Sequence, residues 1–299
     1  MHVLVTGVSG FSGSAVARRL ANGGHDVVGT YRRETDFLAS LRDVARLALV
    51  RTDLTDAGKL AGSFDAIVHT AATSPAPGIN VAALVRDNID ASFALIEAAR
   101  RWGVGCFIFF SSLSYYGRIA QDVVDEATPV RDPDPYGATK LIVERRLAEL
   151  DGTFSTLALR LPGIVGPGAH RNWLSGVAKR LRVGEPVRAF HLDRPYNNAA
   201  HIDDVAALVQ AVLNHEPWGG FDAAVLGAAG SLTVREIIER LALALGVSAE
   251  IEEIAPTNNS FTLSSAHAIA RYGYQPMEIG ALIDRYGREI VGSARSSSR

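Results

Sequence analysis

The chain has 299 residues, of which 47% are hydrophobic and 21% charged, the balance of a globular protein with a buried core. Its 30 basic and 32 acidic side chains leave a formal net charge of −2, so neither a nucleic acid nor an anionic membrane is expected as its main partner. The single cysteine excludes an internal disulfide framework and a cysteine-based zinc cluster. No apolar run reaches the ~20 residues that span a bilayer, and the first residues lack the basic region of a signal peptide. We therefore expect a cytoplasmic protein.

Short apolar runs alternate with longer amphipathic stretches over the first half of the chain. The runs predicted as strands cover residues 3–5, 27–31, 47–50, 66–69, 106–110 and 155–159, and the predicted helices cover 11–21, 35–42, 57–61, 80–102 and 136–150. The predicted strands are almost continuously apolar, as strands buried on both faces of a parallel sheet must be. Repeated β-α-β order predicts an α/β fold with a doubly wound parallel sheet and right-handed crossovers.

A glycine-rich turn follows the first predicted strand and opens the first predicted helix. Gly7, Gly10 and Gly13 permit a tight turn, the close approach of a pyrophosphate, and close packing of the helix on the strand. The helix amino terminus adds unpaired N–H groups and a partial positive charge. This pattern predicts a dinucleotide site, and the alternative is a tight turn without a ligand. The predicted contacts are Gly7, Ser9, Gly10, Phe11, Ser12 and Gly13.

The end of the second strand bears on which dinucleotide is bound. Tyr31, Arg32 and Arg33 stand where a carboxylate would accept hydrogen bonds from the ribose hydroxyls of NAD. Two guanidinium groups suit a 2′-phosphate, so NADP(H) is preferred and NAD(H) remains possible; the alternative is a solvated basic face. After the third strand, Asp53 and Leu54 are predicted to contact the adenine, although an aspartate there also suits a turn or a helix N-cap.

A tyrosine and a lysine lie four residues apart on one predicted helix. The spacing of Tyr136 and Lys140 places a phenol and an ammonium on the same helix face. A nearby ammonium favours the phenolate and lowers the tyrosine pKa from about 10, which makes the phenol a proton donor or acceptor for an alcohol/ketone pair. Ser112, after the fifth strand, is placed to hydrogen-bond the same carbonyl oxygen. These three are the predicted catalytic residues, and the alternative is an ordinary amphipathic helix.

With these residues in place, the chain resembles the extended branch of the short-chain dehydrogenase/reductase family, the epimerase/dehydratase-like branch that modifies nucleotide sugars. The segments that also resemble this branch are 69–72, Asn88, 111–117, 160–168 and 201–206. The resemblance implies a Rossmann fold, hydride transfer at nicotinamide C4, a nucleotide-linked sugar as the small-molecule substrate, and a homodimer.

The resemblance also implies contacts beyond those predicted above. Further cofactor contacts would come from Ala71, Ala72, Asn88, Ser111 and Pro162, besides Tyr136 and Lys140. The residues expected to face the substrate are Ser74, Leu113, Ser114, Tyr115, Arg171, Asn172 and Asn197. For the first four, packing within the loop is an equal alternative. The eight histidines show no metal-ligand spacing, so no metal site is predicted, and His69 and His201 are interpreted as structural.

Three departures from this branch narrow the predicted function. Leu113 and Ser114 stand where dehydratases carry an Asp-Glu pair. Residues 197–200, Asn-Asn-Ala-Ala, stand where many members carry an arginine that grips a diphosphate; Arg194 or Arg171 is the alternative for that role, and each also suits a surface position. Tyr31 replaces the carboxylate of epimerases that hold NAD tightly. The sequence therefore predicts an NADPH-dependent ketoreductase acting on a nucleotide-linked sugar of the 4-keto-6-deoxy type. The alternatives are a nucleotide-sugar 4-epimerase with tightly bound NAD and a non-catalytic regulator that senses NADP(H).

The pattern changes after Leu161 to a Pro- and Gly-rich loop followed by shorter elements, which predicts a smaller C-terminal α/β substrate lobe. Thr233 and Glu236 have the spacing of a capping box for a helix that ends near Gly246, and residues 249–254 read as a strand. We assign residues 1–165 and about 196–222 to the dinucleotide-binding domain, 166–195 and 223–292 to the lobe, and 293–299 to a disordered tail.

Overall fold

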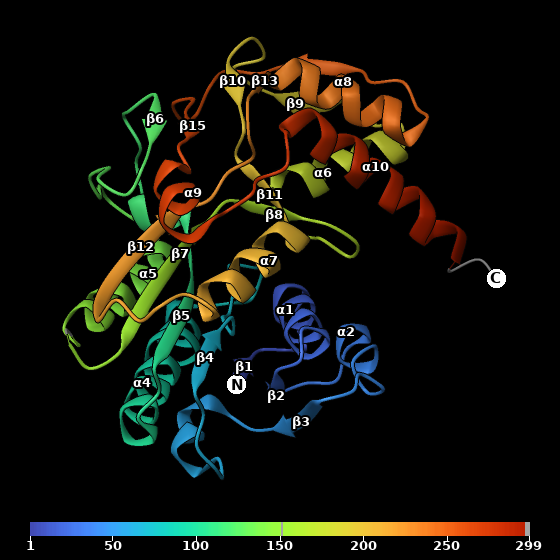
Figure 1. The fold of residues 1–299 in the computed structure, drawn as a ribbon. Helices are drawn as coiled ribbons and strands as arrows, with labels where there is room; N and C mark the ends of the chain where they lie inside the picture. Colours follow the sequence, from blue (N-terminus) through green and yellow to red (C-terminus); the bar gives the residue numbers. More distant parts are fainter. Residues whose placement is uncertain (151, 297–299) are drawn as a thin grey trace. The chain divides into compact units, whose positions relative to one another are not determined.

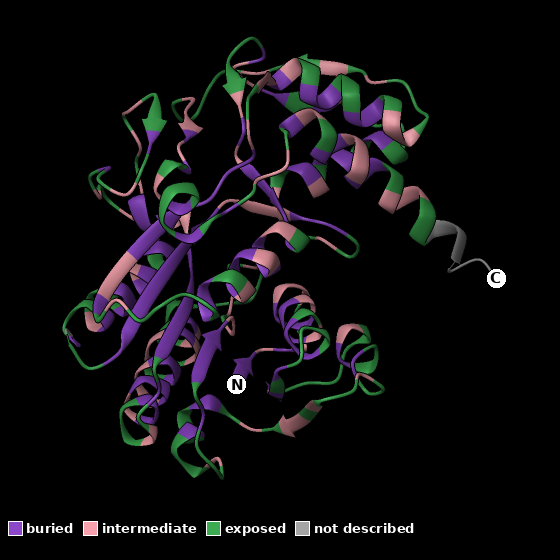
Figure 2. Ribbon diagram, viewed as in Figure 1, coloured by how far each residue is buried: buried purple, intermediate pink, exposed green. Residues whose placement is uncertain are grey.

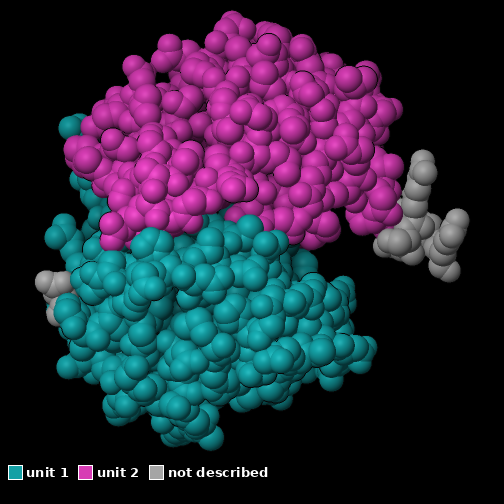
Figure 3. All heavy atoms as spheres, in the orientation of Figure 1, with its two compact units in different colours: residues 1–117, 130–160, 205–224 teal, residues 118–129, 161–204, 225–299 magenta. Residues whose placement is uncertain are grey.

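The computed structural model describes residues 1–150 and 152–296, with side chains up to Ser293. The chain forms two compact units, which are described separately (Figure 3). Unit 1 consists of Met1–Gly117, Val130–Arg160 and Val205–Ala224. Unit 2 consists of Arg118–Pro129, Leu161–Asp204 and the chain from Val225 onward. Among the described residues, no helix combines the length and apolar character needed to cross a membrane.

A seven-stranded sheet forms the centre of unit 1 (Figure 1). Its order is β12-β7-β5-β4-β1-β2-β3, and the pairs β1–β2, β2–β3, β1–β4 and β4–β5 are parallel. The strands are β1 (His2–Thr6), β2 (Asp26–Tyr31), β3 (Leu47–Arg51), β4 (Ala66–His69), β5 (Cys106–Ser112), β7 (Ser155–Leu161) and β12 (Gly220–Val225). Strand order grows outward from β1 in both directions, so the predicted doubly wound α/β fold is confirmed.

Burial follows position in the sheet. The central strands β4 and β5 are buried along almost their whole length, whereas β3 is only half-buried or exposed (Figure 2). The prediction that the apolar run at 47–50 is buried on both faces is therefore wrong, because β3 is an edge strand with one neighbour. The sequence analysis also missed β12, the opposite edge strand.

The helices of unit 1 follow the strands in the expected alternation. They are α1 (Phe11–Asn22), α2 (Asp36–Ala39), η1 (Leu54–Lys59), α3 (Val81–Leu84), η2 (Val85–Asp90), α4 (Ala91–Trp102), η3 (Leu113–Tyr116), α5 (Pro135–Ala148) and α7 (Ile202–Leu213), which begins in unit 2. The helix predicted over 80–102 contains a π-helical segment, η2, between α3 and α4. The segment predicted as a helix over 57–61 is part of the 3₁₀ turn η1.

Unit 2 has its own core, built around two packed helices. These are α8 (Val234–Leu245) and α10 (Ile279–Ser296), whose Leu241, Leu282 and Ile283 are fully buried. Thr233 and Glu236 form the predicted capping box, and Gly246 ends α8 in the left-handed conformation.

The rest of unit 2 consists of two further helices and four small strand pairs. The helices are α6 (Trp173–Arg182) and α9 (Ala266–Tyr272), and the pairs are β8 (Gly163–Val165) with β11 (Ala199–His201), β9 (Val187–Ala189) with β14 (Ile251–Glu253), β10 (Pro195–Tyr196) with β13 (Leu232–Thr233), and β6 (Val123–Val124) with β15 (Thr262–Leu263). The strand expected over 249–254 is β14, which is three residues long.

The unit boundaries differ from the expected domains at residues 118–129, 161–165, 196–204 and 223–224. Residues 118–129 belong to unit 2 because β6 pairs with β15, and residues 196–204 belong there because β11 pairs with β8. The expected disordered tail begins inside α10, which continues to Ser296, and residues 297–299 lie outside the described part of the chain.

Candidate active site

The turn after β1 is shaped by two glycines that the protein itself requires. Gly7 has a φ of +75°, and a Cβ there would lie 2.8 Å from the Ala71 Cα. A Cβ on Gly13 would lie 2.4 Å from the Gly7 carbonyl oxygen and 2.6 Å from Thr70 Oγ1. Since real Cβ atoms do not approach so closely, both glycines are needed to fold the turn and to seat α1 against it.

The middle glycine is less confined by the protein than the other two. A Cβ on Gly10 would meet one atom within 4 Å, the Gly7 carbonyl oxygen at 3.3 Å. Gly10 is exposed and is the N-cap of the twelve-residue helix α1, which has no side-chain cap. Uncapped N–H groups beside an open surface fit the phosphates of a dinucleotide. Ser9, Phe11 and Ser12 border this surface in the sequence and are half-buried.

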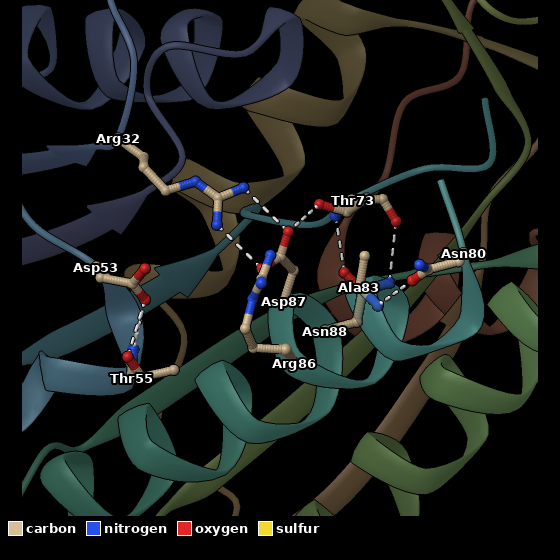
Figure 4. A network of polar contacts seen from close by, with 9 residues as sticks. All are labelled: Arg32, Asp53, Thr55, Thr73, Asn80, Ala83, Arg86, Asp87 and Asn88. Atoms are coloured by element: carbon tan, nitrogen blue, oxygen red, sulfur yellow. Dashed lines mark hydrogen bonds and ion pairs between the residues drawn. The ribbon is translucent and has the colours of Figure 1, made fainter. Parts of the chain in front are cut away.

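The arginine after β2 is held by a carboxylate (Figure 4). Arg32 donates from Nη1 and Nη2 to the two oxygens of Asp87, at 3.0 Å each, so it is not the freely solvated basic group of the alternative interpretation. Arg33 is exposed and Tyr31 half-buried. Asp53 Oδ1 accepts hydrogen bonds from Thr55 N and Oγ1 and caps η1, the alternative role considered for it. Leu54 beside it is buried.

A buried polar network holds the loop that follows β4. Asn88 is buried, accepts from Thr73 N at 2.7 Å, and donates to Thr73 O and to Thr139 Oγ1 on α5. Asn88 therefore ties this loop, which carries Ala71 and Ala72, to the helix of the predicted catalytic pair. The sequence analysis singled out Asn88 but missed Thr73 and Thr139.

His69 has a structural role in the same region. Its two ring nitrogens contact Thr6 Oγ1 and Ser92 Oγ, at 2.8 Å each, and the ring is fully buried. Burial, assisted by the charge of Lys140, lowers the pKa of His69 to about 3, so the ring is neutral. Thr6 Oγ1 also accepts from the backbone N–H of Ala71. Together these contacts lock the carboxyl ends of β1 and β4 to α4.

The structure brings Ser112, Tyr136 and Lys140 together in unit 1. The Ser74 and Ser112 hydroxyls lie close enough to the Tyr136 phenol to lower its pKa, and the Lys140 ammonium lies 5.5 Å from the centroid of the Tyr136 ring. Ser112 ends β5 and Tyr136 opens α5, so two elements supply the cluster. Ser74, expected only to face the substrate, is a third hydroxyl in it.

A close contact between α5 and η3 makes this meeting possible. A Cβ on Gly137 would lie 1.9 Å from the Ser114 carbonyl oxygen, so only glycine permits the helix to approach this closely. Asp134 caps α5 by accepting from Gly137 N at 2.6 Å, which fixes the first turn that carries Tyr136. Leu113 and Ser114 lie half-buried in η3 at this contact.

The protonation states differ from the expectation. Burial raises the pKa of Tyr136 to about 12, and the nearby Ser74 and Ser112 hydroxyls oppose this rise without cancelling it. Burial also lowers the pKa of Lys140 to about 7, opposed by the charge of Glu144. The predicted lowering of the phenol pKa by Lys140 is therefore wrong, because burial raises this pKa and Lys140 is not among the groups that shift it. Tyr136 is a neutral acid near neutral pH.

A buried ion pair that the sequence analysis did not find lies beside this cluster. Glu144, four residues after Lys140 on α5, pairs with Arg160 of β7 at 2.8 Å, and both side chains are at least 95% buried. Ser111 donates to Glu144, so its hydroxyl is used inside the protein and not at the expected cofactor surface. Tyr115 is buried with Arg160 Cζ 4.0 Å from its ring centroid, a packing role where a substrate contact was expected. An arginine within the otherwise apolar strand 155–161 was the sequence signal for this pair.

The remaining expected site residues lie in unit 2. Asn197 is buried, and its amide makes three hydrogen bonds, with Ala228 O, Leu263 O and Leu263 N. The Asn172 side chain caps α6 and donates to Ile164 O. Both amides therefore have structural roles in place of the expected substrate contacts. Arg171 is exposed and Pro162 half-buried.

The glycine turn yields a matched pair of variants. Gly10→Ala adds a methyl group on the open side, so we expect a loss in free energy of unfolding of at most about 1 kcal/mol but at least tenfold weaker NADPH binding. Gly13→Ala adds the same methyl group against the Gly7 carbonyl and is expected to cost about 1–3 kcal/mol of stability. Urea unfolding and fluorescence titration of NADPH measure the two effects. Equal losses of stability in Gly10→Ala and Gly13→Ala would contradict the different roles assigned to the two glycines.

Lys140 predicts a pH-dependent stability. Its pKa is about 7 in the folded chain against 10.5 as the unperturbed value, so the unfolded chain binds more protons between these two pH values. The destabilisation by this buried ammonium is complete below pH 7 and disappears as the pH rises, with a slope of up to about 1.4 kcal/mol per pH unit. We expect Lys140→Met to remove this rise in urea-unfolding free energy between pH 7 and 9.5.

The control for this prediction is the exposed Lys59, whose side chain is 80% accessible to solvent. Lys59→Met removes the same charge from the surface and is expected to leave the pH dependence of stability unchanged. Parallel pH profiles for Lys140→Met and the unsubstituted chain would show that the amine titrates alike in the folded and unfolded states.

Comparison with known proteins places this site in a family. Over residues 3–221 the chain matches the model of the NAD dependent epimerase/dehydratase family. It is 28% identical to a UDP-glucose 4-epimerase of Streptomyces lividans over 263 residues, which cover 79% of this chain and 78% of that protein. It is 30% identical to a 2-alkyl-3-oxoalkanoate reductase of Stenotrophomonas maltophilia over 266 residues, 82% and 76% of the two chains.

A solved structure shares the fold. The UDP-glucuronic acid 4-epimerase from Bacillus cereus, in complex with UDP-glucuronic acid and NAD, superposes with a TM-score of 0.85 at 23% identity and covers 98% of this chain and 100% of its own. The dinucleotide turn, the Ser-Tyr-Lys cluster and the family match agree: this chain is an enzyme of the NAD dependent epimerase/dehydratase family.

Proposed function

We propose that the chain is an NADPH-dependent ketoreductase that reduces the keto group of a nucleotide-linked sugar of the 4-keto-6-deoxy type. The observation that carries this proposal is the cluster of Ser112, Tyr136 and Lys140, in which the ammonium lies 5.5 Å from the ring centroid of Tyr136 and burial raises the pKa of the phenol to about 12. Reduction of a ketone needs a proton donor at the carbonyl oxygen, and a buried phenol that stays protonated is suited to that role. When bound, the dinucleotide supplies the hydride from nicotinamide C4.

Each residue of the cluster has a separate role in the reduction of the carbonyl group. Tyr136 donates its proton to the carbonyl oxygen of the substrate, and Ser112 donates a hydrogen bond to the same oxygen. Lys140, held by a hydrogen bond of 2.8 Å to the Phe110 carbonyl oxygen, lies beside the phenol ring and in its charged form stabilises the phenolate that remains. The N–H groups at the amino terminus of α1, beside Gly10, would hold the pyrophosphate, while Gly7 and Gly13 shape the turn.

The substrate class and the cofactor have separate support. The relatives act, by their names, on UDP-glucose or on a 2-alkyl-3-oxoalkanoate, so both sugar-nucleotide chemistry and ketone reduction occur among proteins similar to this chain. Arg32 and Arg33 support NADP(H) because they supply two guanidinium groups at the end of β2. The homodimer and the cytoplasmic location expected from the sequence remain predictions.

The direct test of the mechanism replaces the proton donor. We expect Tyr136→Phe to bind NADPH within twofold of the unsubstituted chain and to lose about 10²–10⁴-fold in turnover, because the ring remains and only the acidic hydroxyl is lost. Turnover is measured with UDP-, dTDP-, GDP- and CDP-linked 4-keto-6-deoxy sugars, and thermal unfolding checks that the variant is folded. Near-normal turnover would remove Tyr136 from the mechanism.

A second candidate is a nucleotide-sugar 4-epimerase that retains NAD. The ion pair between Arg32 and Asp87 favours it, because that arginine already has an anionic partner. The names of the 28%-identical relatives point the same way. The content of the purified protein separates the two candidates: a reductase is expected to release its cofactor on dialysis, whereas an epimerase is expected to retain oxidised, unphosphorylated NAD, detected by chromatography after denaturation.

A further inference from the structure

Asp87 is the best-partnered carboxylate near the end of β2. It accepts hydrogen bonds from both terminal nitrogens of Arg32, at 3.0 Å each, from the Thr73 hydroxyl at 2.7 Å, and from Arg86 Nε at 2.9 Å. Its side chain is 9% exposed, whereas that of Arg32 is 44% exposed. The hydrogen bonds from Arg32 hold the pKa of Asp87 well below its usual range against the effect of burial, so the carboxylate stays charged at working pH.

Asp87 belongs to the π-helical segment η2, which also carries Asn88. Asp87 and Asn88 are consecutive residues of η2, and both contact Thr73 (Figure 4). The Asp87 carboxylate accepts a hydrogen bond from the Thr73 hydroxyl. The Asn88 amide accepts from the Thr73 backbone N–H and donates to the Thr73 carbonyl oxygen. Two adjacent side chains of η2 therefore contact the same loop, and π-helical segments recur at functional sites. Asp87 is therefore fixed from two sides, by its own helix and by the loop after β4.

This arrangement has a consequence for a ligand with a 2′-phosphate. A guanidinium binds a phosphate best with a fork of two N–H donors, and the fork of Arg32 is occupied by Asp87. A 2′-phosphate must break this fork or share it, and in either case a dianion lies near a fixed carboxylate. NAD(H), which carries a hydroxyl at this position, meets no such repulsion.

We propose that Asp87 determines how strongly the chain discriminates NADP(H) from NAD(H), by holding Arg32 in an ion pair that competes with the 2′-phosphate. Asp87 acts through Arg32 and lowers the selectivity that Arg32 and Arg33 would otherwise give. The inference rests on the proposed use of a nicotinamide dinucleotide, but it does not require that NADPH be the preferred one.

The test measures binding alone, by fluorescence titration of NADPH and of NADH. Asp87→Asn keeps the size of the side chain and an oxygen for Thr73 but removes the charge. We expect it to lower the dissociation constant of NADPH about fivefold and to change that of NADH less than twofold, the size typical of a partly exposed ion pair. In an Arg32→Ala background, the same substitution is expected to leave both dissociation constants unchanged.

Asp90→Asn is the matched control, because Asp90 is exposed on the same π-helical segment and its loss changes the net charge equally. It is expected to shift the NADPH/NADH ratio less than twofold. Equal shifts for Asp87→Asn and Asp90→Asn, or an Asp87 effect that survives Arg32→Ala, would overturn the inference in favour of a general charge effect. Thermal unfolding of each variant establishes that it is folded.

The same measurements test the role of Asp87 separately from the proposed preference for NADPH. If the unsubstituted chain binds NADH better than NADPH, the proposed NADPH preference fails, while an Arg32-dependent gain in Asp87→Asn still supports the role of Asp87. If the chain prefers NADPH and Arg32→Ala abolishes that preference, but Asp87→Asn changes neither constant, the proposed preference stands and the role of Asp87 is overturned.

Discussion

The contact of Gly137 with the Ser114 carbonyl is the constraint on which the catalytic cluster depends. Ser112 and Tyr136 lie on different elements, and their hydroxyls meet only because α5 approaches η3 without an intervening Cβ. Any larger side chain would separate the two elements by more than a hydrogen bond tolerates. A glycine within a helix lowers helix stability by about 1 kcal/mol relative to alanine, and here the Asp134 cap offsets part of that cost.

Burial then decides the chemistry of the cluster. The same desolvation keeps the Tyr136 phenol protonated and makes the Lys140 amine titrate near neutral pH, although in water the two groups would titrate at similar pH values. Glu144 favours the charged amine and is itself balanced by Arg160 and Ser111. This buried pair costs desolvation energy, but it ties β5, β7 and α5 together directly beside the reacting groups.

Two polar networks connect the ends of the dinucleotide site. Asn88 links the loop after β4 to Thr139 on the helix of the catalytic pair, and Asp87 links the same loop to Arg32 at the end of β2. Both residues come from one π-helical segment. The groups that would face the two halves of a dinucleotide are therefore held through adjacent residues, so that one local irregularity in a helix positions both.

The sequence by itself determined the features that depend on local periodicity and backbone conformation. These include the doubly wound sheet, the glycine turn before α1, the shared helix face of Tyr136 and Lys140, and the capping box at Thr233. They were predictable because glycine, capping residues and apolar spacing act within a few neighbouring positions.

The tertiary structure alone decided which charges are paired and how far each group is buried. Arg32 binds Asp87, which is 55 residues away in the chain, and the Asn197 amide binds Leu263, which is 66 residues away. Burial has the largest effect on the Tyr136 pKa. Desolvation and ion pairing depend on elements distant in the chain, so no local pattern could specify them.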